Sequence, residues 1–224
     1  MKRNKALTLY LSGSLGQIAI ICMMVFVLRR NEMIVDYTSP MGMAAIGVGG
    51  VSSALWGIIV AIKYKKYELK KIVKDFFAVF FHGELMIEAW YIPLSLFLKA
   101  LIFGGIEEIG WRYIFQPALQ ERFSYFLSTL MTFGAWGIWH FMYFYIEGTV
   151  LQVNVIDFLA GLLTSCFMLS ALYIKTKSLW ICVMTHALFN VFSQITTGGS
   201  SYVSYLCKII IILIAVVLST KKQE

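Results

Sequence analysis

One stretch organises this chain, Phe103-Gly-Gly-Ile-Glu107-Glu108-Ile-Gly-Trp-Arg112-Tyr-Ile-Phe115. It places two adjacent carboxylates and an arginine inside an otherwise apolar run that is compatible with a helix. Charged side chains at membrane depth are costly, so they usually face an interior site and mark function. At about 100° of rotation per residue, Glu108 and Arg112 share one helix face and can pair, whereas Glu107 points to another face. A buried ion pair that locks two helices together would explain Glu108 and Arg112 but would leave Glu107 unassigned.

The composition indicates a polytopic membrane protein. Of the 224 residues, 59% are hydrophobic and only 14% are charged, and the mean hydropathy is +0.77. A soluble domain would carry about 25% charged residues. The length suits a single multi-span membrane domain over residues 1–224, without a separate soluble domain. The net charge of +7 does not imply a nucleic-acid partner, because the basic residues gather at the ends of apolar runs, where they can contact anionic lipid.

The apolar runs predict an all-α bundle of about eight transmembrane helices, since a span needs about 20 residues to cross the hydrocarbon core. The basic loop at 63–74 and the basic residues near both chain ends predict cytoplasmic termini. The segment 75–90 is compatible with a short span or with a partly interfacial helix. The other predicted spans cover residues 6–28, 41–62, 91–119, 123–146, 153–174, 179–195 and 202–218.

Three of the predicted helices carry polar side chains that are spaced for one face. They are Glu107, Glu108 and Arg112 on the first, Trp136 and His140 on the second, and His186 and Asn190 on the third. A lone membrane histidine is often only an interhelical hydrogen-bonding residue, but two of them with an unpaired glutamate and an amide predict a shared polar site. Gly104 and Gly105, one turn before the carboxylates, would let a neighbouring helix approach closely.

These residue types suit hydrolysis. A glutamate in apolar surroundings can serve as a general base for water, and a neutral histidine can orient that water or protonate a departing amine. A second histidine and the Asn190 amide could donate to a developing oxyanion. Arg112 would hold Glu108 and so keep the two carboxylates in different roles. The tryptophans at 111, 136 and 139 are more typical of packing, as an apolar wall around the site.

The three motifs, in this order, resemble the CPBP family, which comprises the CAAX prenyl proteases and the bacteriocin-processing or immunity proteins and is also called the Abi family. The matching strings are Glu107-Glu108-x-x-x-Arg112, Trp136-x-x-x-His140 and His186-x-x-x-Asn190, although phenylalanine is more usual than Trp136 at its position. The resemblance implies an intramembrane endopeptidase similar to type II CAAX prenyl proteases, with a catalytic core at about 91–195. Carried over by position, Glu107 and His140 would activate the attacking water, and His186 and Asn190 would stabilise the oxyanion. Glu108 and Arg112 would support the site.

The resemblance also implies a membrane-embedded or lipidated peptide or protein as substrate, of the prenylated or bacteriocin type. We expect no cofactor, with a divalent metal such as zinc as the alternative, because two histidines and a glutamate can imitate a zinc ligand set. The sequence has no His-Glu-x-x-His helix, and using Glu107 as a ligand would leave only Glu108 as a nearby base. The four cysteines occur singly, without a CxxC pair, and are more typical of small core residues than of ligands or disulfides.

Two other functions fit parts of this pattern. A non-proteolytic bacteriocin immunity or membrane binding and scaffold protein would keep the same fold and use the site only to hold a partner. A proton-coupled transporter would string ionisable groups such as Lys99, Glu107 and Asp157 along the membrane normal, but the sequence shows no internal repeat. The Lys- and Ile-rich composition favours the cell membrane of a bacterium as the location.

Overall fold

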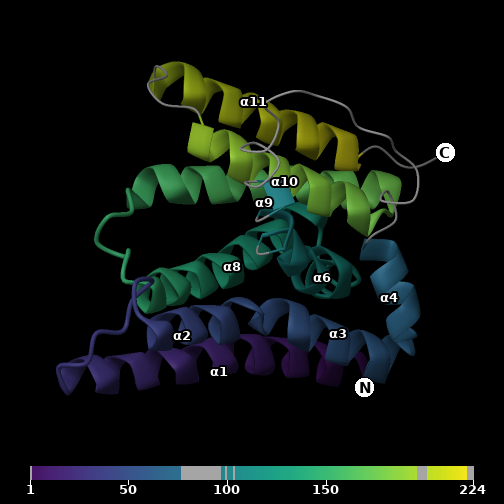
Figure 1. The fold of residues 1–224 in the computed structure, drawn as a ribbon. Helices are drawn as coiled ribbons and strands as arrows, with labels where there is room; N and C mark the ends of the chain where they lie inside the picture. Colours follow the sequence, from purple (N-terminus) through teal and green to yellow (C-terminus); the bar gives the residue numbers. More distant parts are fainter. Residues whose placement is uncertain (1, 77–96, 99, 103, 196–200, 221–224) are drawn as a thin grey trace, which may run out of the picture.

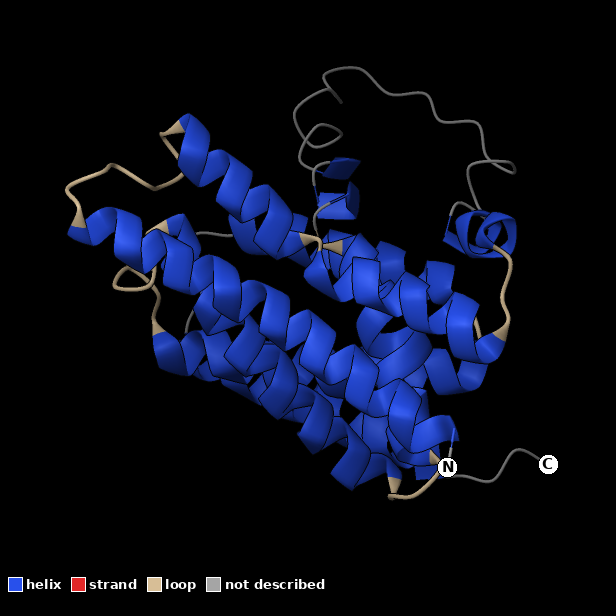
Figure 2. Cartoon of the chain, turned by 90° about the horizontal axis from the view of Figure 1, so that it is seen from below, coloured by secondary structure: helices blue, strands red, loops and turns tan. Residues whose placement is uncertain are grey.

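The computed structural model describes residues 2–76, 97, 98, 100–102, 104–195 and 201–220 (Figure 1). Within these ranges every regular element is a helix (Figure 2). Four stretches are long and apolar enough to cross a membrane: Asn4–Arg30, Pro40–Lys65, Val155–Thr176 and Tyr202–Ser219. The chain is therefore an all-α membrane protein, as the sequence predicts. The number of about eight spans stays a prediction.

The first layer of the fold consists of α1 (Lys2–Arg30), α2 (Pro40–Gly50) and α3 (Ser52–Lys65), which pack on one another. The Ser39 side chain caps α2 by accepting the N–H of Gly42, and a proline follows at the first helical position, where it is well tolerated. The span expected at 41–62 corresponds to the apolar stretch Pro40–Lys65, within which a turn at Val51 separates α2 from α3. Two consecutive glycines end α2 there, and glycine has a low helix propensity.

The opposite layer consists of α9 (Val155–Thr176), α10 (Leu179–Ile195) and α11 (Ser201–Thr220). The helix α8 (Tyr125–Glu147) and the short α6 (Glu108–Gly110) lie between the two layers (Figure 1). Helix α8 starts where the Ser124 side chain accepts the N–H of Leu127, and it ends at Gly148, whose φ of 86° favours glycine. The predicted spans at 123–146, 153–174, 179–195 and 202–218 thus correspond to observed helices.

The carboxylate stretch is not the regular helix that the sequence predicts over 91–119. Its described part has a 3₁₀ turn η1 (Gly105–Glu107), α6 (Glu108–Gly110), a π-helical turn η2 (Trp111–Phe115) and α7 (Gln116–Gln120). Such a π turn widens a helix locally and is frequent at functional sites. The physical reason is crowding: the stretch contacts α3, α8, α9 and α10 together.

One close approach shows this crowding directly. A Cβ atom on Gly57 of α3 would lie 3.0 Å from the backbone of Gly110, so α3 packs on α6 almost backbone to backbone. The absence of a side chain at Gly57 is what permits this close packing. Helix α4 (Leu69–Phe76) follows α3, and the rest of the ambiguous segment, 77–90, lies outside the described residues together with Lys99.

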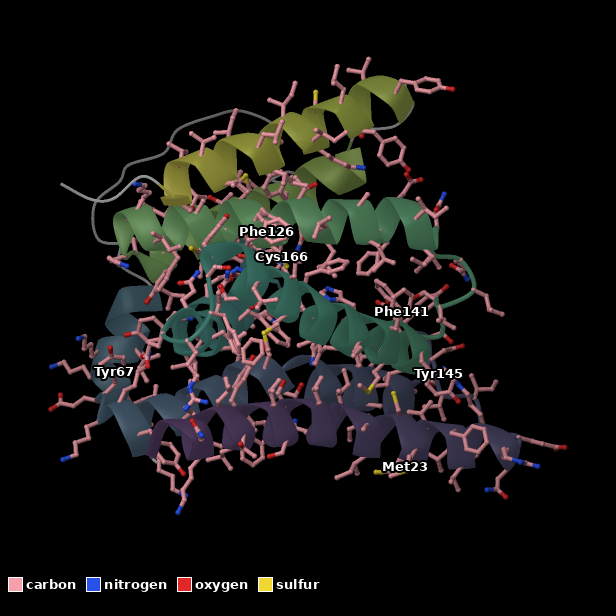
Figure 3. The ribbon with its side chains drawn as sticks, turned by 180° about the vertical axis from the view of Figure 1, so that it is seen from behind. Met23, Tyr67, Phe126, Phe141, Tyr145 and Cys166 are labelled. Carbon is pink, nitrogen blue, oxygen red and sulfur yellow. The ribbon has the colours of Figure 1, made fainter. Side chains whose placement is uncertain are left out.

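The core fills the space between the two layers. The rings of Trp111, Trp136 and Trp139 are almost completely buried there. Figure 3 shows Cys166 of α9 directed into the bundle, whereas Met23 of α1 projects from its outer side. An apolar outer surface around a polar interior is the arrangement that a lipid environment favours.

Candidate active site

Glu108 is completely buried and has two ionisable neighbours. Its Oε1 lies 2.8 Å from Nδ1 of His186 on α10, and its Oε2 lies 3.5 Å from Nε of Arg112. The pair with Arg112 is the one that the four-residue spacing predicts. The contact with His186 joins residues 78 positions apart, and no sequence pattern indicates that these two would pair. Glu108 thus ties the carboxylate stretch to α10.

Glu107 is also buried but has a different partner. Its Oε2 accepts a hydrogen bond of 2.8 Å from Nε1–H of Trp136 on α8. The adjacent carboxylates therefore face different helices, as their positions around a helix predict. Trp136 was expected to share a helix face with His140 and to shield the site, and in the structure it also donates to Glu107.

The ring of Trp136 lies at the centre of the site. Its centroid is 5.2 Å from that of His140 and 5.4 Å from that of His186, which meets it edge-on at 80°. The guanidinium carbon of Arg112 lies 4.7 Å from the Trp136 centroid, within the range of a cation–π contact. One aromatic ring thereby brings residues of all three motifs together.

His140 points one nitrogen at its own helix. Its Nδ1 lies 3.0 Å from the backbone oxygen of Trp136, which can only accept, so Nδ1 carries a proton. In the neutral ring Nε2 then presents a lone pair. The rings of Trp139 and Phe158 lie 5.1 and 5.2 Å away, centroid to centroid, and surround the imidazole with apolar surface. Within the described residues no hydrogen bond joins His140 directly to Glu107.

His186 and Asn190 converge on Gly104. A Cβ atom at Gly104 would lie 2.3 Å from Nδ2 of Asn190 and 3.3 Å from Nε2 of His186. The two groups can therefore reach one point only because position 104 has no side chain. At Gly105 a Cβ atom would lie 2.8 Å from Cγ1 of Val183, also on α10. The predicted close approach of a helix to this glycine pair is confirmed.

One further neighbour of the site has no signal in the sequence. The Sγ atom of Cys166 on α9 lies 3.7 Å from Nη2 of Arg112 and accepts a weak hydrogen bond from it. Single cysteines in apolar runs predict only core packing, and Cys166 is indeed completely buried. Cys166 thus contacts the same guanidinium that pairs with Glu108.

The residues that could imitate a zinc site do not form one. In the part of the chain that the structure describes, no group of three His, Cys, Asp or Glu side chains is arranged to hold a metal. Zinc needs its ligands to converge at about 2.0–2.2 Å from one point. Nδ1 of His186 meets Glu108 and Oε2 of Glu107 accepts from Trp136, which leaves Nε2 of the two histidines and the second oxygen of Glu107 as the candidate ligands.

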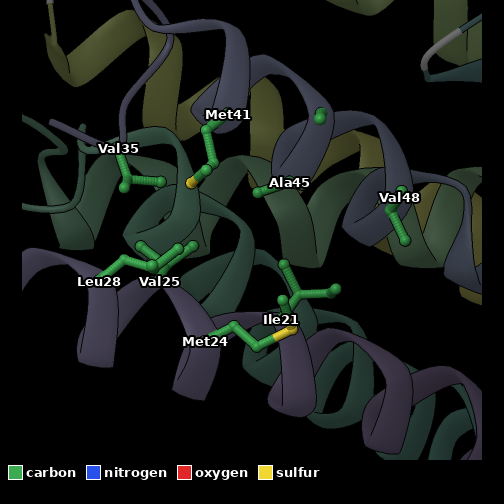
Figure 4. Close-up of a pocket in the computed structure, with 9 residues that line it drawn as sticks. Ile21, Met24, Val25, Leu28, Val35, Met41, Ala45 and Val48 are labelled. Carbon is green, nitrogen blue, oxygen red and sulfur yellow. The ribbon is translucent and has the colours of Figure 1, made fainter. Parts of the chain in front are cut away.

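A separate cavity lies between α1 and α2 and does not belong to this site (Figure 4). It measures about 340 Å³ and is lined by apolar side chains such as Met24, Leu28 and Met41. Since it offers no polar group, it can carry no hydrolytic chemistry.

Comparison with known protein families gives an independent result. Residues 88–192 match the family described as type II CAAX prenyl endopeptidase Rce1-like. A comparison with curated proteins gives no match. The matched range contains all three motifs and all six predicted site residues. The match of residues 88–192 to the Rce1-like family of type II CAAX prenyl endopeptidases agrees with the resemblance that the three motifs indicate.

Proposed function

We propose that this protein is an intramembrane endopeptidase that hydrolyses a peptide bond of a membrane-associated substrate, with water activated by Glu107 and His140. The observation that carries the proposal is the separation of the two carboxylates. Arg112 pairs with Glu108, so Glu107 is not neutralised by it and is held through one oxygen by Trp136. The other oxygen of Glu107 is then available to accept a proton from water.

The reaction follows from these positions. A water gives a proton to Glu107 and attacks the carbonyl carbon of the substrate, which forms a tetrahedral oxyanion. The C–N bond then breaks, and the proton passes from Glu107 to the departing nitrogen, with Nε2 of His140 orienting the water or relaying the proton. The rings of the buried Trp139 and the partly buried Phe158 beside His140 support this role, because they limit the access of bulk water to the imidazole.

His186 and Asn190 would stabilise the oxyanion. Their convergence at Gly104 supports this role, since two donors directed to one point form an oxyanion hole. Nδ1 of His186 lies against Glu108, and its Nε2 would donate to the oxyanion when both ring nitrogens carry protons. Arg112 and Glu108 are positioning residues, because they orient His186 without contacting the substrate.

The proposal needs no metal. A carboxylate and an imidazole supply the base and the proton relay, and the geometry of the candidate ligands supports their use in this way. The family suggests a lipidated or prenylated protein as the substrate class. A location in a bacterial cell membrane with cytoplasmic termini is part of the proposal and is supported by the basic residues at 63–74 and near both chain ends.

The test compares peptide termini in membranes of cells that express the wild type or Glu107→Gln at matched levels. New termini that depend on Glu107 are expected and would also identify the substrate. A chelator added to the active protein should leave cleavage unchanged. Equal termini in both samples, with both proteins folded, would overturn the proposal and favour a binding or immunity role.

A further inference from the structure

A column of polar side chains leads away from the buried ion pair. Gln116 and Gln120 follow Arg112 at intervals of four residues. The side chain of Gln116 is polar and uncharged, and it is only 2% exposed. Gln120 is half-buried near the end of α7, where Arg122 hydrogen-bonds Asn4 of α1. The column therefore runs from the basic end of α1 to Glu108.

The hydrogen bonds of Gln116 fix the orientation of its amide. The hydroxyl of Thr129 donates to the backbone oxygen of Tyr125 at 2.7 Å, so it can only accept from Gln116, whose Nε2 lies 2.9 Å away. The hydroxyl of Ser170 accepts from the same Nε2 and from Nε2 of Gln120, the latter at 3.3 Å. The amide nitrogen of Gln116 thus faces the hydroxyls, and its oxygen points elsewhere.

Two complementary polar atoms in this column have no protein partner. Among the described residues, neither Oε1 of Gln116 nor Nη1 of Arg112 has a hydrogen-bond partner, and both are inaccessible to bulk solvent. One is an acceptor and the other a donor, and they belong to residues one turn apart. The π turn Trp111–Phe115 lies between them and widens the helix, since the N–H of Gln116 bonds to the oxygen of Trp111. Buried polar groups are nearly always satisfied by protein or by ordered water.

We infer that a bound water molecule bridges Nη1 of Arg112 and Oε1 of Gln116, and that the column through Gln120 connects this water with the surface. The water accepts from Arg112 and donates to Gln116, so both orphaned groups are satisfied. Hydrolysis inside a membrane consumes one water per bond cleaved, and a polar column gives that water a route around the apolar wall. This delivery role rests on the proposed function, whereas the water site itself does not.

The test uses hydroxyl radicals generated by brief X-ray irradiation of the purified protein, since radicals formed from a bound water modify the nearest side chain. Cys166 is the reporter, because its sulfur contacts Arg112 and is otherwise buried. Met33, which is exposed in the loop between α1 and α2, normalises the dose. We expect modification of Cys166 in the wild type and a fall of at least about threefold in Gln116→Leu, which cannot hold the water.

Gln17→Leu is the matched control, because both polar atoms of the Gln17 amide have protein partners: its nitrogen donates to Val48 and its oxygen accepts from Trp56. In this variant Cys166 should be modified to the same extent as in the wild type. Gln116→Met replaces Gln116→Leu if the latter does not fold. The inference would be overturned if Cys166 were not modified in the wild type. It would also be overturned if the folded Gln116 variant and the wild type showed the same level of Cys166 modification. If the Gln116 variant loses Cys166 modification but the wild-type protein shows no proteolysis, the water site stands and only the proposed function is contradicted.

Discussion

The carboxylate stretch and helix α11 show two different ways in which this sequence determines structure. Helix α11 runs without interruption over 20 residues, and only 6% of its apolar window is buried inside the protein. The stretch from 105 to 120 changes between 3₁₀, α and π geometry within 16 residues, and every residue from Glu107 to Phe115 is buried. Most of helix α11 faces outward and needs only apolar side chains there, whereas the carboxylate stretch depends on individual partners.

This difference predicts how each region responds to substitution. On a lipid-facing surface one apolar side chain can replace another, because the surrounding lipid adapts to its shape. In the carboxylate stretch Glu107, Glu108 and Arg112 each have a specific protein partner, and removal of one partner leaves the other group buried and unpaired.

The largest loss is expected for Arg112→Ala, which leaves the Glu108 carboxylate buried with only His186 as a partner. Breaking a buried pair in this way costs about 3–5 kcal/mol, so the yield and thermal stability of the folded protein in detergent should fall. The control is Arg122→Ala, which removes an exposed arginine at the end of α7 and should have little effect. Unchanged yield and stability for Arg112→Ala would mean that the pair does not support the fold.

Trp136→Phe should come next, because it removes the donor to Glu107 and keeps most of the ring. A hydrogen bond to a charged group contributes about 1.5–3 kcal/mol. Trp139→Phe is a close control on the same helix, since Trp139 is equally buried and donates at 2.8 Å to the neutral hydroxyl of Ser52. Its loss should be about 0.5–1.5 kcal/mol. Chemical denaturation of both variants checks the order, and equal losses would show that Glu107 does not depend on Trp136.

Gly104→Ala tests the convergence of His186 and Asn190. The new methyl group would displace the Asn190 amide, and overpacking of this kind costs about 1–3 kcal/mol. Cleavage should fall by more than this change in stability explains, because the donors to the oxyanion move apart. Gly161→Ala on α9 serves as the control, since a Cβ atom there meets nothing within 4 Å. Full cleavage by Gly104→Ala would separate these donors from the chemistry.

The smallest effect is expected on α11. Ile210 is 45% exposed on this helix, so Ile210→Ala should change the free energy of unfolding by no more than about 0.5 kcal/mol. Thermal unfolding in lipid nanodiscs measures this. A loss as large as that of Trp136→Phe would show that α11 has a specific partner on this face.

The same contrast explains how far the sequence predicts the structure. Composition and the lengths of apolar runs predict the all-α membrane fold and the positions of α8 to α11, since these depend on average hydropathy. Helical spacing predicts the pair of Glu108 with Arg112 and the separate direction of Glu107. The π turn, the contact of Glu108 with His186 and the place of Cys166 depend on how distant helices meet, and local spacing contains no information about that.

The most direct test of the account measures peptide cleavage by purified Glu107→Gln beside the wild type, together with thermal stability. The glutamine keeps the size of the side chain and can still accept from Trp136, but it cannot take a proton from water. Cleavage should fall by at least about 100-fold, as expected for loss of a general base, while the melting temperature changes little. Full cleavage by Glu107→Gln would contradict the central claim that Glu107, the carboxylate that does not pair with Arg112, activates the attacking water.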